Sequence, residues 1–166
     1  LLALHNINFD LNKKKKNTIN FIIGGSNKYF KFNEDTQNKI LNDLEFLSEN
    51  SSIYVIPSRR TPPEFIKNLS TLKNHNIKLF SDLFDPITYG DLLSESNMQI
   101  VTWDSISMIS EAISSETGTF LYEFEEESCP KRYRLFHQMV KQKGFLKNFS
   151  RNMKPYTISM SSYNSE

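Results

Sequence analysis

Three short apolar segments, each typical of a buried β-strand, run into a polar turn and then into a segment with helical spacing of apolar residues. With their turns they cover residues 21–26, 54–61 and 100–105. Strands that alternate with helices predict βαβ units and a parallel sheet. Open sheets of this kind bind ligands at the carboxyl ends of their strands, which is where these polar turns fall. The pattern predicts an α/β fold, a Rossmann-like doubly wound sheet with a ligand site at one edge.

The alternation continues through most of the chain and predicts about five or six parallel strands. We expect strands at 19–23, 52–56, 76–80, 98–102 and 119–124. We expect helices at 34–48, after Pro62, after Ser105 and at 131–142. Right-handed crossovers leave few topologies for such a sheet. If the strand order is 3-2-1-4-5, the three polar turns meet at the switch point, where the strand order reverses between the first and fourth strands.

End signals support these helices. Asn33 is a suitable N-cap for the first helix, and Thr61 followed by Pro62 has the favoured cap-then-proline order. Gly144 is a natural end for the last helix. We therefore expect a Rossmann-like domain over 19–149. Residues 1–18 would be a linker or an edge from a missing N-terminal domain, and residues 150–166 a C-terminal tail that docks on the domain or is mobile.

Composition excludes several classes of protein. The 166 residues suffice for one domain, and a formal net charge of +1 gives no field that favours nucleic acid. The single cysteine, Cys129, cannot form an internal disulfide, which fits a reducing compartment and a cytoplasmic protein. No apolar run reaches the ~18 residues that a membrane span needs, although a peripheral membrane contact stays open. The opening segment has neither a methionine nor a signal-peptide pattern, and we expect a piece of a longer protein.

The first polar turn has the residues expected at a phosphate site. Gly24 and Gly25 lack a Cβ, so the backbone could approach an anion closely. Ser26 and Lys28 add a hydroxyl and an ammonium group. Tight turns also use paired glycines for geometry alone, so both interpretations of the glycines stand.

The second polar turn adds an arginine pair, Arg59 and Arg60, directly after a buried strand. A guanidinium group binds phosphate through charge-assisted hydrogen bonds. One arginine could face the ligand while the other braces the following helix. The alternative is a structural salt bridge for both.

The third turn opens the helix that contains Glu111. Ser105 and Ser107 fall in its first turn, where hydroxyls and free N–H groups could hold a diphosphate. Asp104 is expected either to join this site or to serve as the N-cap, which would explain it without a ligand. Glu111 follows in an apolar stretch where an unpaired carboxylate would be costly. It could accept hydrogen bonds from two ribose hydroxyls, or pair with a backbone group or a lysine.

Other familiar sites are missing from the sequence. It contains no P-loop, no GxGxxG turn, no GxSxG elbow and no Cys/His spacing for zinc, so we predict no metal and no bound cofactor. No catalytic residue can be assigned. His137 follows Phe136 on the last helix and is interpreted as a structural histidine rather than a catalyst.

Several blocks of this sequence resemble the mitochondrial fission "elongated mitochondria" family, which is related to glycosyltransferases of the GT-B architecture. The resemblance extends from about Leu4 to Phe149. The matching blocks are 23–32, Ser58-Arg59-Arg60-Thr61-Pro62, 102–112 and Arg134-Leu135-Phe136-His137. The second and third blocks are the more specific.

The resemblance implies that this chain is the C-terminal half of a GT-B-type protein, which binds a nucleotide-diphosphate sugar as substrate. By that resemblance Gly25 and Ser26 would approach the diphosphate, Ser105 would lie beside it, and Glu111 would hold the ribose. The loop near Phe84 and Asp85 would face the base. The isolated half is expected to bind without turnover, because the general base often comes from the other domain. The protein would act in the cytoplasm of a bacterium or on the cytosolic face of mitochondria.

Two other functions remain open. The first is a non-enzymatic interaction or scaffold protein, which the resemblance to the plant members of the family implies, and Trp103 filling the donor pocket would favour it. The second is a nucleoside-diphosphate-sugar epimerase. The missing GxGxxG turn counts against an epimerase, because that enzyme needs bound NAD.

Overall fold

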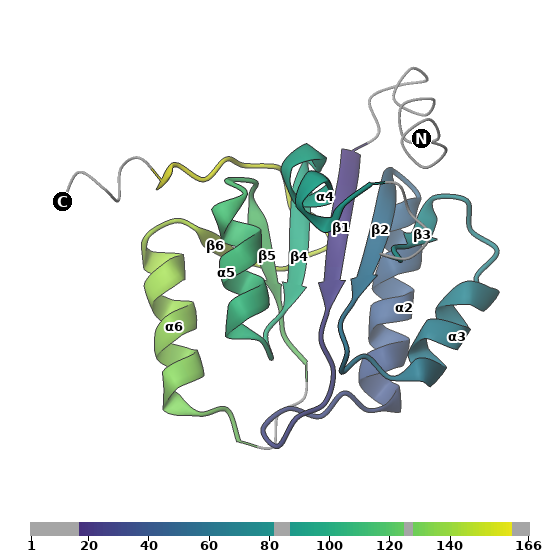
Figure 1. Cartoon of the computed structure of the whole chain (residues 1–166), viewed down its shortest axis with the longest axis horizontal. Helices are drawn as coiled ribbons and strands as arrows, with labels where there is room; N and C mark the ends of the chain where they lie inside the picture. The colour runs from purple at the N-terminus through teal and green to yellow at the C-terminus, as the bar shows by residue number, and fades with distance from the viewer. Residues whose placement is uncertain (1–16, 82–86, 125–127, 161–166) are drawn as a thin grey trace.

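A single parallel sheet forms the centre of the domain (Figure 1). The structure, a computed structural model, describes residues 17–81, 87–124 and 128–160. Its strands are β1 (Asn17–Ile23), β2 (Ser51–Pro57), β3 (Ile77–Leu79), β4 (Met98–Thr102), β5 (Thr119–Tyr122) and β6 (Leu146–Asn148). Their order is β3-β2-β1-β4-β5-β6, and every neighbouring pair is parallel. The predicted fold class is confirmed, including the reversal between β1 and β4.

Helices cover both faces of the sheet. They are α2 (Glu34–Ser48), α3 (Pro63–Thr71), α4 (Tyr89–Glu95), α5 (Ile106–Ser114) and α6 (Lys131–Gln142). Successive residues of a strand point to opposite faces, so Phe21 packs with the side chains of α2 and α3, whereas Ile22 packs with those of α4, α5 and α6. Strands buried on both faces have the nearly continuous apolar sequence that marked them in the chain.

Most element boundaries agree with the sequence patterns, and α2, β4 and α6 agree at both ends. Asn33 is the N-cap of α2, and its side chain accepts a hydrogen bond from the Thr36 N–H at 2.9 Å. Gly144 follows α6 with a φ of 77°, a conformation that glycine adopts readily. The sequence patterns did not identify α4 or β6, because seven and three residues are too few for a clear period.

The expected role of Thr61 as a helix cap is wrong. Helix α3 begins at Pro63, and Pro62 is its N-cap. The Thr61 hydroxyl instead donates to the Gly24 carbonyl at 2.7 Å and accepts from the Ser58 N–H at 2.9 Å. Thr61 therefore ties the turn after β2 to the turn after β1.

The described part of the C-terminal segment docks at the amino end of β5. The Tyr156 hydroxyl donates to the Thr119 carbonyl at 2.6 Å and accepts from the Thr119 N–H at 3.0 Å. The Gly118 N–H donates to the Tyr156 carbonyl at 2.9 Å. At the other end of the chain, Asn17 and Thr18 belong to β1 rather than to the expected linker.

Candidate functional site

The three polar turns meet at the carboxyl edge of the sheet, as the strand order requires. Asp104, only 1 % exposed, lies at their centre. Its Oδ2 accepts from the Gly25 N–H at 3.1 Å and lies 2.8 Å from Nη2 of Arg60. Nη1 of Arg60 donates to the Gly25 carbonyl at 3.1 Å. One carboxylate and one guanidinium group thus join the turns after β1, β2 and β4.

Close packing between these turns explains both glycines. A Cβ on Gly24 would lie 2.0 Å from Oδ2 of Asp104, and a Cβ on Gly25 would lie 2.0 Å from the Arg60 carbonyl oxygen. The anionic group that approaches this backbone is therefore a carboxylate of the chain itself. The Gly25 N–H, expected to contact a diphosphate, is already donated to Asp104.

Asp104 is not the N-cap of α5, and that expectation is wrong. Ser105 is the cap, and its hydroxyl accepts from the Met108 N–H at 3.3 Å. The hydroxyls of Ser105 and Ser107 lie 3.3 Å apart. Asp104 stands one residue earlier, where the chain still faces the Gly24-Gly25 turn.

The remaining residues of the expected phosphate site lie at the surface. Ser26, Lys28, Arg59 and Ser107 are exposed. The Ser26 hydroxyl accepts from the Phe32 N–H at 2.9 Å, which holds its turn in place. The expected residues therefore divide into those that join the three turns around the buried Asp104 and a set of exposed polar groups that do not.

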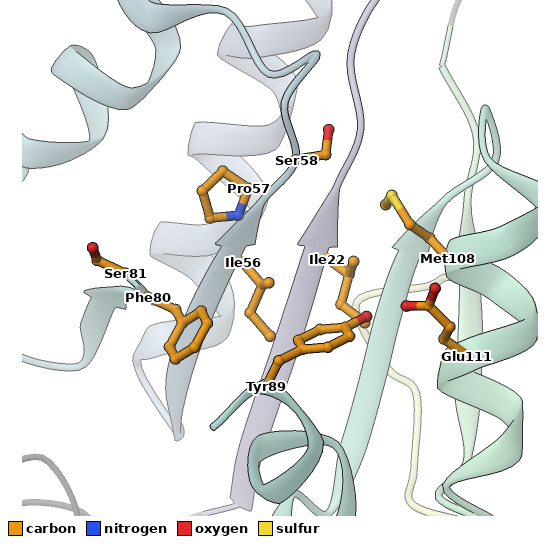
Figure 2. Close-up of a pocket in the computed structure, with 9 residues that line it drawn as sticks. All are labelled: Ile22, Ile56, Pro57, Ser58, Phe80, Ser81, Tyr89, Met108 and Glu111. Atoms are coloured by element: carbon orange, nitrogen blue, oxygen red, sulfur yellow. The ribbon is translucent and has the colours of Figure 1, made fainter. Parts of the chain in front are cut away.

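A pocket of about 480 Å³ opens on the sheet face that α4 and α5 flank (Figure 2). Nine residues line it: Ile22, Ile56, Pro57, Ser58, Phe80, Ser81, Tyr89, Met108 and Glu111. Ile22, Ile56 and Phe80 are apolar, whereas Ser58 lies at the end of the pocket nearest the polar turns and Glu111 lies opposite the Tyr89 hydroxyl (Figure 2). Glu111 is the single ionised side chain among these nine residues.

Glu111 lines the pocket, but its environment differs from the expected one. We expected its carboxylate to be buried, and the residue is exposed beside the pocket. Met108 and Glu111 are three residues apart on α5 and share the helix face that lines the pocket, whereas Ser107 does not line it. Phe84 and Asp85, the expected base-side loop, fall outside the described residues.

Tyr89 is a pocket residue that the sequence patterns did not indicate. Its ring lies across the pocket from α5, and its hydroxyl points toward the Glu111 carboxylate (Figure 2). Burial, the charge of Glu111 and their hydrogen bond all raise the pKa of Tyr89, so the phenol stays protonated. No local signal could have placed it, because its position depends on how α4 packs against α5.

Trp103 is not among the residues that line this pocket. Its ring packs against Phe30 and stacks over His137, with a centroid separation of 6.4 Å and an interplanar angle of 17°. Burial and the nearby Lys141 lower the pKa of His137 to about 4, although a hydrogen bond with the Trp103 backbone opposes the shift. The neutral, buried imidazole fits the structural role expected for His137.

The described residues contain neither a candidate metal site nor a helix that could span a membrane. No group of three or more His, Cys, Asp or Glu side chains within 17–81, 87–124 and 128–160 could hold a metal ion. Over those same residues, no helix combines the length and apolar character needed to cross a membrane.

The fold and the pocket define a Rossmann-like α/β domain with a ligand-sized hollow near the carboxyl ends of its strands. Residues 2–164 match the family described as Mitochondrial fission ELM1, and the chain belongs to that family. An uncharacterized protein of Rickettsia prowazekii (strain Madrid E), RP120, is 34 % identical to it over 131 residues. That alignment covers 74 % of this chain and 36 % of the relative, so the chain spans about a third of the relative's length.

Proposed function

We propose that this chain binds a nucleotide-diphosphate sugar and is the donor-binding, C-terminal half of a GT-B-type glycosyltransferase-like protein. The observation that carries the proposal is the pocket near the point where the strand order reverses, with the Glu111 carboxylate on one wall and apolar side chains on the floor. Ligands of open α/β sheets bind in that region. A carboxylate facing an apolar cavity suits a sugar ring with two hydroxyl groups attached to a planar base.

In this proposal the distribution of charge separates the place of the nucleoside from the place of the diphosphate. The lining residues include no cation, so the pocket suits the uncharged nucleoside rather than the phosphates. Exposed Ser26, Lys28 and Arg59, with Ser107 at the start of α5, offer hydroxyl and cationic groups for the diphosphate. Arg60 and the buried Asp104 hold these turns together.

Titration calorimetry with UDP, GDP, CMP and ADP tests this proposal. We expect one nucleotide to bind, and Glu111→Ala to weaken that binding at least about tenfold, because a charge-assisted hydrogen bond contributes about 1.5–3 kcal/mol. Glu45→Ala is the matched control, since Glu45 is exposed on α2, on the opposite face of the sheet. If none of the four binds to the folded protein, the donor site is refuted.

One observation favours a second function, a non-enzymatic interaction protein. Asp104 occupies the Gly25 N–H and neutralises Arg60, which removes two groups expected to bind phosphate. The position of Trp103 outside the pocket supports the donor site instead. A folded chain without nucleotide affinity would favour the interaction protein.

As a donor-binding half, the chain would require the N-terminal domain of the same protein to complete a catalytic cleft. In this proposal the isolated chain binds its nucleotide sugar but does not transfer the sugar. The cytoplasm, or the cytosolic face of mitochondria, is the compartment that supplies such activated sugars.

A further inference from the structure

The pocket contains a pair of polar groups contributed by two separate helices. Tyr89 is the first residue of α4, and Glu111 lies in α5, 22 positions further along the chain. Thr88 caps α4, its hydroxyl accepting from the Asp91 N–H at 3.1 Å, and so holds the first turn that presents Tyr89. The phenol of Tyr89 and the carboxylate of Glu111 point toward each other (Figure 2).

The chemistry of the pair makes the Tyr89 phenol the hydrogen-bond donor and the Glu111 carboxylate the acceptor. The phenol is half-buried and Glu111 is anionic, so the pKa of Tyr89 is raised and the phenol remains a hydrogen-bond donor. An exposed glutamate otherwise samples many rotamers, and its immobilisation on binding costs free energy. The Tyr89 hydroxyl points toward this carboxylate, and a hydrogen bond donated by the phenol would restrict the carboxylate before a ligand arrives (Figure 2). The carboxylate still has lone pairs for two further donors.

We propose that Tyr89 is a positioning residue, which holds the Glu111 carboxylate in the orientation that receives the ribose hydroxyls of the nucleotide. This inference rests on the proposed function of the pocket. Tyr89 acts through Glu111, so its contribution depends on the ligand hydroxyls that Glu111 binds. A residue that only stabilises α4 would affect every ligand equally.

A thermodynamic cycle that combines one substitution with one change in the ligand distinguishes a positioning role for Tyr89 from a role in stabilising α4. Calorimetry would compare the unmodified chain and Tyr89→Phe, each with the ribonucleotide that binds and with its 2′-deoxy form. We expect Tyr89→Phe to weaken the ribonucleotide about fivefold to tenfold and the 2′-deoxynucleotide less than about twofold. Tyr133→Phe on α6 is the control, because Tyr133 packs against Phe30 and does not line this pocket.

Each result decides the proposal. Equal weakening of both ligands, or no weakening of either, would overturn the positioning role while leaving the donor site intact. Failure of the unmodified chain to bind any ribonucleotide would overturn the donor site and this inference with it. Selective loss for the ribonucleotide, with Tyr133→Phe unchanged, would support the assignment.

Discussion

Asp104 explains why the turn after β1 contains two glycines. In the sequence, Gly24 and Gly25 have the composition of a turn that binds a phosphate, although tight turns also use paired glycines for geometry alone. The negative group in the structure is Asp104, which Arg60 balances at 2.8 Å. Glycine is needed there because a Cβ would overlap a carboxylate and a backbone carbonyl.

This packing predicts that Gly24→Ala destabilises the domain through Asp104. The new Cβ would overlap Oδ2, and relief of such overlap costs about 1–3 kcal/mol in a packed site. In an Asp104→Ala background the same substitution should cost less than about 0.5 kcal/mol, because the obstructing atoms are gone. Urea unfolding of the four proteins gives the coupling. Equal costs in both backgrounds would show that the overlap is relieved elsewhere.

The buried His137 predicts a loss of stability in mild acid. Above pH 6.5 its ring is neutral in both the folded and unfolded chain. Below pH 6.5 the unfolded chain binds a proton that the folded chain refuses until about pH 4, so the free energy of unfolding falls through this window. The loss attributable to His137 should reach about 2 kcal/mol by pH 5.

Urea unfolding between pH 7 and pH 5 measures this slope. His137→Phe removes the titrating ring and should flatten the dependence, whatever its effect on absolute stability. An unchanged slope in that variant would mean that other groups control the acid response.

At the scale of single elements, local patterns predicted long helices and central strands well. Helix α2 has an N-cap, acidic residues in its first turn and an apolar stripe, all of which are local signals. Helix α4 and strand β6, with seven and three residues, are too short to show a clear apolar period. Thr61 looked like a cap because its neighbours suit one, yet its hydroxyl forms stronger links with the turn after β1.

Helix α4 gives a direct test of local propensity. Gly90→Ala should stabilise the domain by about 0.4–1 kcal/mol, because an added Cβ would meet no heavy atom closer than 3.9 Å and alanine reduces the freedom of the unfolded chain. Thermal unfolding would show the rise. A lower melting temperature would indicate that residue 90 needs a conformation that alanine avoids.

The docked C-terminal segment gives a second test at this scale. Tyr156→Phe removes the hydroxyl that serves both the N–H and the carbonyl of Thr119, and should cost about 1–3 kcal/mol. Tyr133→Phe serves again as the control. A decrease in the free energy of unfolding of less than about 0.3 kcal/mol would mean that water replaces the hydroxyl beside Thr119.

For the whole molecule, strand order predicts a gradient of stability. Strand β1 pairs along both sides, with β2 and β4, whereas β3 and β6 are three-residue strands at the two edges. Amide hydrogen exchange should therefore be slowest in β1 and β4, by at least about tenfold relative to β3 and β6. Uniform exchange across the sheet would instead indicate that the domain opens only as one unit.

The sequence by itself determined the fold class and the alternation of the longer strands and helices, and it limited the strand order to a few possibilities, one of which brings the three turns to the same edge of the sheet. Periodicity, capping and crossover handedness are local or general constraints, so no distant contact had to be known. Only the tertiary structure decided what the turns do on meeting. Gly25 and Asp104 are 79 residues apart, and their contact depends on β1 and β4 lying side by side. Tyr89 and Glu111 likewise meet because α4 and α5 pack over one sheet face. Pairings of this kind follow from packing across the sheet, which no short stretch of sequence encodes.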